Sequence, residues 1–139
     1  MSNPERYLLD TSMLLAHYRE ESGSETVQGL FEDPEFEILI ATPTLTEFAR
    51  RLRELGAADA EIIDAIDKYS LLFNEIVATD ASIATAAYVI GRQLPGRIPL
   101  IDALIAATAQ AHGAILVHRD AHMASIPTEI VRQQSLILP

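Results

Sequence analysis

The chain has 139 residues, and 49% of them are hydrophobic, which is enough for one domain with its own core. Twenty acidic residues against ten basic ones give a net charge of −10, which argues against a broadly basic nucleic-acid-binding surface. The absence of cysteine excludes disulfides and thiolate metal sites, and no apolar run reaches the roughly 18 residues of a membrane helix. Residues 1–6 do not read as a signal peptide, so we expect a single cytoplasmic domain over residues 1–139.

Strand-like and helix-like segments alternate along the chain. In the first half we expect, in order, a strand at 6–9, helices at 12–20 and 24–32, a strand at 37–41, and helices at 44–55 and from 59 onward. Ser12 and Thr44 are suitable residues to begin two of these helices. The last helix places apolar side chains on one face at helical spacing, namely Ile62, Ile63, Ile66, Tyr69 and Leu72 or Phe73.

The second half continues the alternation. We expect, in order, a strand at 75–78, a helix capped by Asp80 that runs to about 92, a loop at 94–96, a helix at 99–113, a strand at 114–117 and an edge strand at 128–133. Strands separated by helices favour parallel pairing. The expected fold class is therefore α/β, a three-layer α/β/α sandwich with a central parallel sheet of four to five strands.

Two carboxylates interrupt the most apolar segments of the chain. Asp10 lies within residues 7–16, and Asp102 lies within residues 99–107. A lone carboxylate in such surroundings costs roughly several kcal/mol to desolvate unless a partner or a metal compensates it. The pattern indicates a site that gathers carboxylates around a hard cation.

Four acids are expected to meet at one rim of the sheet, because sites in parallel sheets form beyond the carboxyl ends of the strands. Asp10 ends the first strand, and Glu47 lies one turn into the helix after the second strand. Asp120 follows the strand at 114–117, and Asp102 lies near the start of the helix that leads into that strand.

Four segments resemble the acidic motifs of PIN-domain ribonucleases, and most closely those of VapC-type toxins from toxin–antitoxin pairs. They are, in chain order, Leu9-Asp10-Thr11-Ser12, Thr44-Leu45-Thr46-Glu47, residues 102–109 and His118-Arg119-Asp120. The resemblance covers essentially the whole chain. It implies a PIN-like fold, catalytic roles for Asp10, Glu47, Asp102 and Asp120, and a metal-dependent endoribonuclease that is often dimeric and is held inactive by a small antitoxin protein.

The fourth motif departs from the family pattern at three places. His118 stands where the family often has Thr or Ser, and Met123 stands where it often has an aromatic residue. Where some members carry an additional acid or amide, this chain has Ala121-His122.

The expected chemistry follows from the oxygen ligands. Asp10, Asp102 and Asp120 are the candidate ligands, and oxygen donors favour Mg²⁺ or Mn²⁺ over zinc. Such ions activate a water and offset the charge of a phosphodiester. Attack of that water on RNA would leave a 5′-phosphate and a 3′-hydroxyl. The candidates for holding a water or contacting phosphate are Thr11, Ser12, Arg97 and Arg119.

Each acid also has a purely structural interpretation. Asp10 can be a helix cap, and Thr44 with Glu47 forms the pattern of a capping box. Asp102 can favour the positive end of its helix dipole, and Asp120 can be a turn residue.

Several other polar residues are expected to serve structure alone. We favour His118 and His122 as hydrogen-bonded or exposed histidines rather than metal ligands. Arg50, Arg51 and Arg53 are expected to form a solvated helix face.

Two other functions compete with a ribonuclease. A metal-dependent phosphatase or phosphotransfer domain usually needs a second Asp beside the first or a strand-end Lys, whereas Thr11-Ser12 follows Asp10 and Lys68 lies within a predicted helix. The other alternative is a catalytically inactive PIN-fold module that binds RNA or protein.

Overall fold

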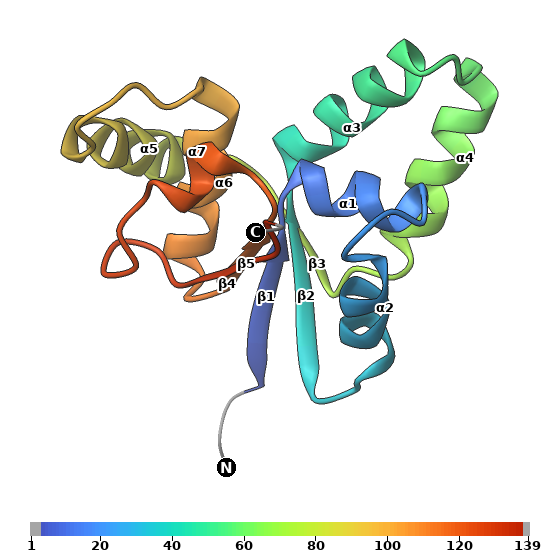
Figure 1. Cartoon of the computed structure of the whole chain (residues 1–139), viewed down its shortest axis with the longest axis horizontal. Helices are drawn as coiled ribbons and strands as arrows, with labels where there is room; N and C mark the ends of the chain where they lie inside the picture. The colour runs from blue at the N-terminus through green and yellow to red at the C-terminus, as the bar shows by residue number, and fades with distance from the viewer. Residues whose placement is uncertain (1–3, 138–139) are drawn as a thin grey trace.

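A computed structural model describes residues 4–137 and contains a five-stranded sheet in which every pairing is parallel (Figure 1). The strands are β1 (Glu5–Leu9), β2 (Phe36–Ala41), β3 (Glu75–Val77), β4 (Ile115–His118) and β5 (Gln133–Ser135). Their order across the sheet is β3-β2-β1-β4-β5. The predicted α/β sandwich with a central parallel sheet is confirmed.

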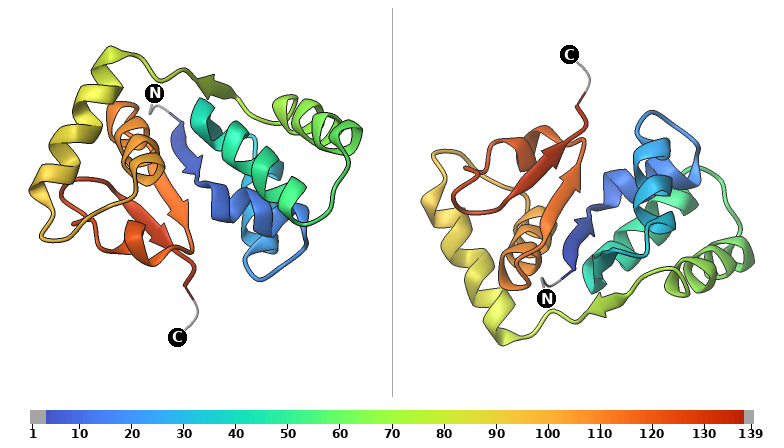
Figure 2. Two further views of the ribbon diagram at one scale, coloured as in Figure 1. Left: turned by 90° about the horizontal axis from the view of Figure 1, so that it is seen from above. Right: turned by 90° about the horizontal axis from the view of Figure 1, so that it is seen from below.

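Helices connect the strands and cover both faces of the sheet (Figure 2). They are α1 (Thr11–Tyr18), α2 (Ser24–Glu32), α3 (Thr42–Glu54), α4 (Asp59–Ser70), α5 (Ala81–Gln93), α6 (Leu100–Ala111) and α7 (Ala121–Ala124). Within residues 4–137, none of them is long and apolar enough to cross a membrane.

Alternate residues of the strands build two separate cores. Leu8 and Leu39 pack on the face covered by α5, α6 and α7. Their neighbours Leu9 and Ile40 pack on the opposite face, which is covered by α1 to α4. This alternation is the period-two pattern of a sheet buried on both faces.

The predicted edge strand at 128–133 is wrong in position, because β5 begins only at Gln133. The N–H groups of Ile130 and Val131 both donate to the carbonyl of Pro127, at 2.9 and 3.2 Å. The chain therefore needs residues 127–130 for a turn. That turn also follows α7, a helix too short for the sequence pattern to indicate.

The apolar face predicted for α4 is narrower than expected. Ile62 and Tyr69 are buried, as is Phe73 beyond the end of the helix, whereas Ile63 is 59% exposed and Leu72 is 50% exposed. Only one stripe of α4 contacts its neighbours, and Ile63 lies one residue, or about 100° of helix rotation, outside that stripe.

Helix caps agree with the sequence at one predicted position and differ at two. Asp80 caps α5 as predicted, with Oδ1 accepting from the N–H of Ile83 at 2.9 Å. The prediction that Ser12 caps α1 is wrong, because Asp10 is the cap residue. Thr44 does not begin α3, since that helix starts at Thr42 with a proline in its first turn, a favoured place for proline.

The sheet reverses its winding direction between β1 and β4. From β1 the chain continues to β2 and β3 on one side, then crosses to β4 on the other side. At the carboxyl ends of this pair, the N–H of Asp10 donates to the carbonyl of Val117 at 3.1 Å. In open α/β sheets such a switch point is where ligands bind.

The core of α3 offers a test of the packing. Leu52 is 2% exposed in the cluster of α1 to α4, so Leu52→Ala should lower the free energy of unfolding by about 2–5 kcal/mol. Leu71→Ala is the matched control, because Leu71 is 86% exposed and its truncation should cost less than about 0.5 kcal/mol. Urea unfolding of both variants measures the difference. Equal effects would contradict this packing.

Candidate metal centre

A cavity of about 380 Å³ opens at the carboxyl rim of the sheet, beside the switch point. The four predicted acids all line it, although they come from four different parts of the chain. The lining residues are Asp10, Thr11, Ser12, Leu15, Glu47, Arg51, Pro99, Asp102, Arg119 and Asp120. Topology therefore does bring the acids together, and most of the predicted neighbours come with them.

Asp10 is both a helix cap and a wall of the cavity. Its Oδ1 accepts from the Oγ of Ser12 at 2.6 Å and from the N–H of Met13 at 3.0 Å. Ser12 Oγ in turn accepts from the N–H of Arg119 at 3.2 Å, which links the end of β1 to the loop after β4. The capping interpretation and the site interpretation of Asp10 are thus compatible, since Oδ1 alone makes the cap.

Asp102 lies in the first turn of α6, and its side chain is 15% exposed. Burial, with the negative charges of Asp120 and Glu47, raises the pKa of Asp102 to about 6 against the opposing effect of His122. Asp102 is therefore the carboxylate that the other groups of the cavity surround.

Glu47 reaches the cavity from the second turn of α3 and does not take part in a capping box. Thr44 lies inside the helix, and its buried Oγ1 has no hydrogen-bond partner among residues 4–137. Glu47 therefore does not form the capping box that the sequence pattern allowed.

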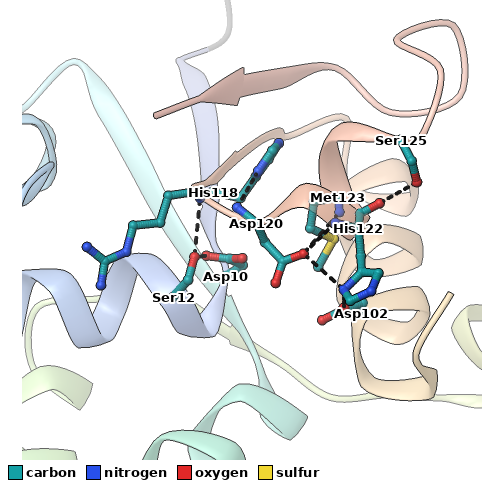
Figure 3. Close-up of polar contacts among 9 residues, drawn as sticks. Asp10, Ser12, Asp102, His118, Asp120, His122, Met123 and Ser125 are labelled. Carbon is teal, nitrogen blue, oxygen red and sulfur yellow. Dashed lines mark hydrogen bonds and ion pairs between the residues drawn. The ribbon is translucent and has the colours of Figure 1, made fainter. Parts of the chain in front are cut away.

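Asp120 ends the loop after β4 and caps α7. Its Oδ1 accepts from the N–H groups of His122 at 2.7 Å and Met123 at 3.3 Å (Figure 3). Its own N–H donates to Nδ1 of His118 at 3.1 Å, and Nε2 of His118 contacts Oε1 of Gln133 at 2.8 Å. Burial lowers the pKa of the His118 imidazole, so this histidine is a neutral support for the loop.

The arginines are distributed differently from the prediction. Arg119 lines the cavity, but its guanidinium contacts Glu21 Oε1 at 2.6 Å and the carbonyl of Ser22 at 3.3 Å. Arg97 is not brought to the acids, because it lines a separate cavity of about 770 Å³ between α5 and α6. Arg51, which was expected on a solvated face, is 52% exposed and also lines the acidic cavity.

His122, which was expected to be an exposed or hydrogen-bonded histidine, is exposed and also lies beside two of the acids. Its Nδ1 lies 3.4 Å from Oδ1 of Asp120 and 3.7 Å from Oδ2 of Asp102. In Figure 3 the Asp120 carboxylate points toward the space between Asp10 and His122. The position two residues after Asp120, where relatives carry an acid or amide, was the available signal.

Charge repulsion and burial make the cavity suited to a divalent cation. Burial, with the charges of Asp120 and Asp102, raises the pKa of Asp10 to about 7, although hydrogen bonds from Ser12 and Met13 oppose the rise. Without a cation, Asp10 and Asp102 thus hold their protons more tightly than ordinary carboxyls. A divalent ion relieves this strain, and the oxygen donors present fit Mg²⁺ or Mn²⁺.

This electrostatic strain predicts a pH-dependent gain in stability for Asp10→Asn in metal-free buffer. The folded pKa of Asp10 is raised from 3.8 to about 7, so the stability that its protonation gives is present below pH 4 and is lost as the pH rises through 7. Asparagine also caps helices and carries no charge. The variant should therefore match the wild type at about pH 4 and exceed it at pH 8 by a few kcal/mol, at about 1.4 kcal/mol per pKa unit.

Urea unfolding with a chelator at both pH values measures this gain. A difference between the two proteins that does not change with pH would contradict the raised pKa of Asp10.

Comparison with known proteins identifies the family. The family model described as PIN domain matches residues 7–129. No curated protein sequence matches the chain.

Three solved structures illustrate the likeness in fold. VapBC2 from Rickettsia felis, bound to a DNA fragment from its promoter, has a TM-score of 0.75 at 18% identity, covering 94% of this chain and 98% of that one. VapBC-5 from Mycobacterium tuberculosis has a TM-score of 0.68 at 21% identity, covering 95% and 99%. VapC20 from the same organism, described as a sarcin–ricin loop cleaving toxin, has a TM-score of 0.61 at 17% identity, covering 79% and 86%. With a family match over most of its length and VapC toxins as structural neighbours, the chain belongs to the PIN domain family.

Proposed function

We propose that this protein is a divalent-metal-dependent endoribonuclease and the toxin of a toxin–antitoxin pair. The observation that carries the proposal is the cavity at the switch point, where four carboxylates from separate elements crowd together and two have pKa values of about 7 and 6. The family match and the VapC neighbours, one of them described as cleaving the sarcin–ricin loop, support RNA as the substrate.

Asp10, Asp102 and Asp120 would hold the cation, which is Mg²⁺ or Mn²⁺. When bound, the ion supplies Lewis acidity that activates an attacking water and offsets the charge of the phosphodiester. Hydrogen bonds with neighbouring side chains hold two of these acids in position. Ser12 fixes Asp10, and His118 fixes the backbone of Asp120.

The remaining residues of the cavity have distinct tasks toward the RNA. Glu47 is placed to accept a proton from the attacking water, because its carboxylate enters the cavity from α3 beside Asp102. Arg51 is placed to contact a phosphate, because its half-exposed side chain lines the same wall, where its guanidinium pairs with Glu54 at 3.0 Å. Attack by water leaves a 5′-phosphate and a 3′-hydroxyl.

The competing function is a PIN-fold module that binds RNA or protein without cutting it. Such a module gains nothing from holding a buried carboxylate beside two others, since their repulsion costs stability. The acidic cavity therefore favours turnover over binding alone.

Replacement of single acids tests the ribonuclease directly. Asp10→Asn and Asp102→Asn should each lower single-turnover cleavage of mixed RNA in Mn²⁺ by about 100-fold or more, because a ligand loss exceeds the 10–100-fold typical of outer-shell changes. Asp120→Asn should retain measurable activity, since asparagine keeps the cap of α7 and water can replace the lost oxygen.

Asp80→Asn is the matched control, because Asp80 caps α5 through the same kind of Oδ1 bond and does not line the cavity. It should cut RNA at the wild-type rate. Wild-type protein that binds RNA but releases no 5′-phosphorylated product would favour the binding module instead.

We further propose that a small basic antitoxin binds this acidic chain and that the chain forms a homodimer. A groove of about 310 Å³ between α1 and α4 combines Tyr18, Tyr69 and Leu72 with the acid Glu61, while Asp64 in the same groove pairs with Lys68 at 2.9 Å. Such a groove suits an amphipathic partner helix with basic residues. The net charge of −10 and the VapBC neighbours support the partner.

Exposed apolar side chains on a second surface favour the dimer. Tyr88 is 67% exposed and Leu100 is 72% exposed, and both line the cavity between α5 and α6. Because they lie on the opposite face of the sheet from the groove, a dimer formed there would leave the groove open to the antitoxin.

Co-purification tests the antitoxin groove. The chain should pull down the small basic protein encoded beside its gene, and Leu72→Asp should weaken this binding about tenfold or more by placing a charge in the groove. Leu71→Asp is the control, because Leu71 is exposed but does not line the groove. Loss of binding in both variants, or in neither, would contradict the groove.

A further inference from the structure

His122 occupies the outer edge of the acidic cavity. It is the second residue of α7, two residues after the cap residue Asp120, and its side chain is 58% exposed. One ring nitrogen and one carboxylate oxygen each from Asp102 and Asp120 lie within 4.8 Å of one another. Three potential ligand atoms therefore face a common space.

The distances in this group suit a shared cation better than direct contact. Nδ1 of His122 lies 3.4 Å from Asp120 and 3.7 Å from Asp102, which is longer than a good charge-assisted hydrogen bond of about 2.7–2.9 Å. Neighbouring donor atoms around one cation are about 3–3.6 Å apart, given metal–ligand bonds of about 2.1–2.2 Å.

A second observation at the cavity is an unpartnered buried hydroxyl. Thr11 lines the cavity and is 6% exposed, and its Oγ1 has no hydrogen-bond partner within residues 4–137. Buried hydroxyls without a partner are uncommon. Thr11 directly follows Asp10 in the chain, and both residues line the cavity.

We propose that His122 is a nitrogen ligand of the metal centre and makes it selective for Mn²⁺ over Mg²⁺. This inference rests on the proposed metal-dependent function and deepens it. Asp102 and Asp120 provide oxygen donors, and His122 adds one imidazole nitrogen. Imidazole suits transition metals, whereas Mg²⁺ keeps to oxygen ligands, so the added nitrogen strengthens Mn²⁺ binding alone.

The side chain of His122 is not needed to hold α7 together. Its backbone N–H donates to Asp120 Oδ1, and its carbonyl accepts from Ser125 Oγ at 2.6 Å, so the fold of α7 uses only its main chain. The imidazole is therefore available to the cavity, and its removal should leave the protein folded.

Pulsed electron paramagnetic resonance of bound Mn²⁺ tests the nitrogen ligand without reference to activity. At pH 7.5 the wild-type spectrum should show nitrogen modulation from a coordinated imidazole, and His122→Ala should abolish it. Titration should show that His122→Ala weakens Mn²⁺ binding about tenfold while changing Mg²⁺ binding less than about threefold.

His112→Ala is the matched control, because His112 is the cap at the far end of α6 from Asp102. It should keep both the nitrogen modulation and the Mn²⁺ affinity. Circular dichroism confirms that each variant is folded.

The outcomes separate this inference from the proposed function. Wild-type protein that binds Mn²⁺ and cuts RNA without nitrogen modulation, or modulation that persists in His122→Ala, overturns the histidine ligand and leaves the nuclease intact. Wild-type protein that neither binds a divalent ion nor cuts RNA overturns both.

Discussion

The unfavourable burial of one carboxylate governs the arrangement of this site. Asp10 is 3% exposed at the end of the central strand, where its ionised form is poorly solvated and repelled by Asp102 and Asp120. The fold tolerates this because Ser12 and Met13 donate to Oδ1 and because a cation can neutralise the remaining charge. The same constraint explains why the acids face a cavity rather than a packed interior.

Two cores hold the site in place from opposite faces. The acids Asp10 and Glu47 come from elements on the α1–α4 face, while Asp102 and Asp120 come from α6 and the start of α7 on the other face. The hydrogen bond from the Arg119 N–H to Ser12 Oγ joins the two halves at the rim. The geometry of the candidate metal centre thus depends on how both layers of helices pack on one sheet.

Much of the fold and of the acidic site could be predicted from the sequence, because several independent local patterns indicate the same arrangement. Asp10 and Asp102 were recognisable from their apolar neighbours, and the alternation of strands and helices placed them on one rim. Arg97 was wrongly expected near the acids, and the place of Arg51 at the cavity was not predicted, because nearness in sequence says little about the direction of a long side chain. The nearness of His122 to the acids was not predicted, because a four-residue helix has no periodicity in the sequence, although that helix positions the imidazole.

Asp10 both caps a helix and lines the cavity, which limits the residues that position 10 can accept during evolution. One carboxylate oxygen caps α1, so a copy released from selection for catalysis still needs a capping side chain at this position. Asn, Ser or Thr would be tolerated there, whereas position 102, which caps nothing, would be free to accept many residues. In degenerate copies, the erosion of the site should therefore begin at Asp102 and reach position 10 last.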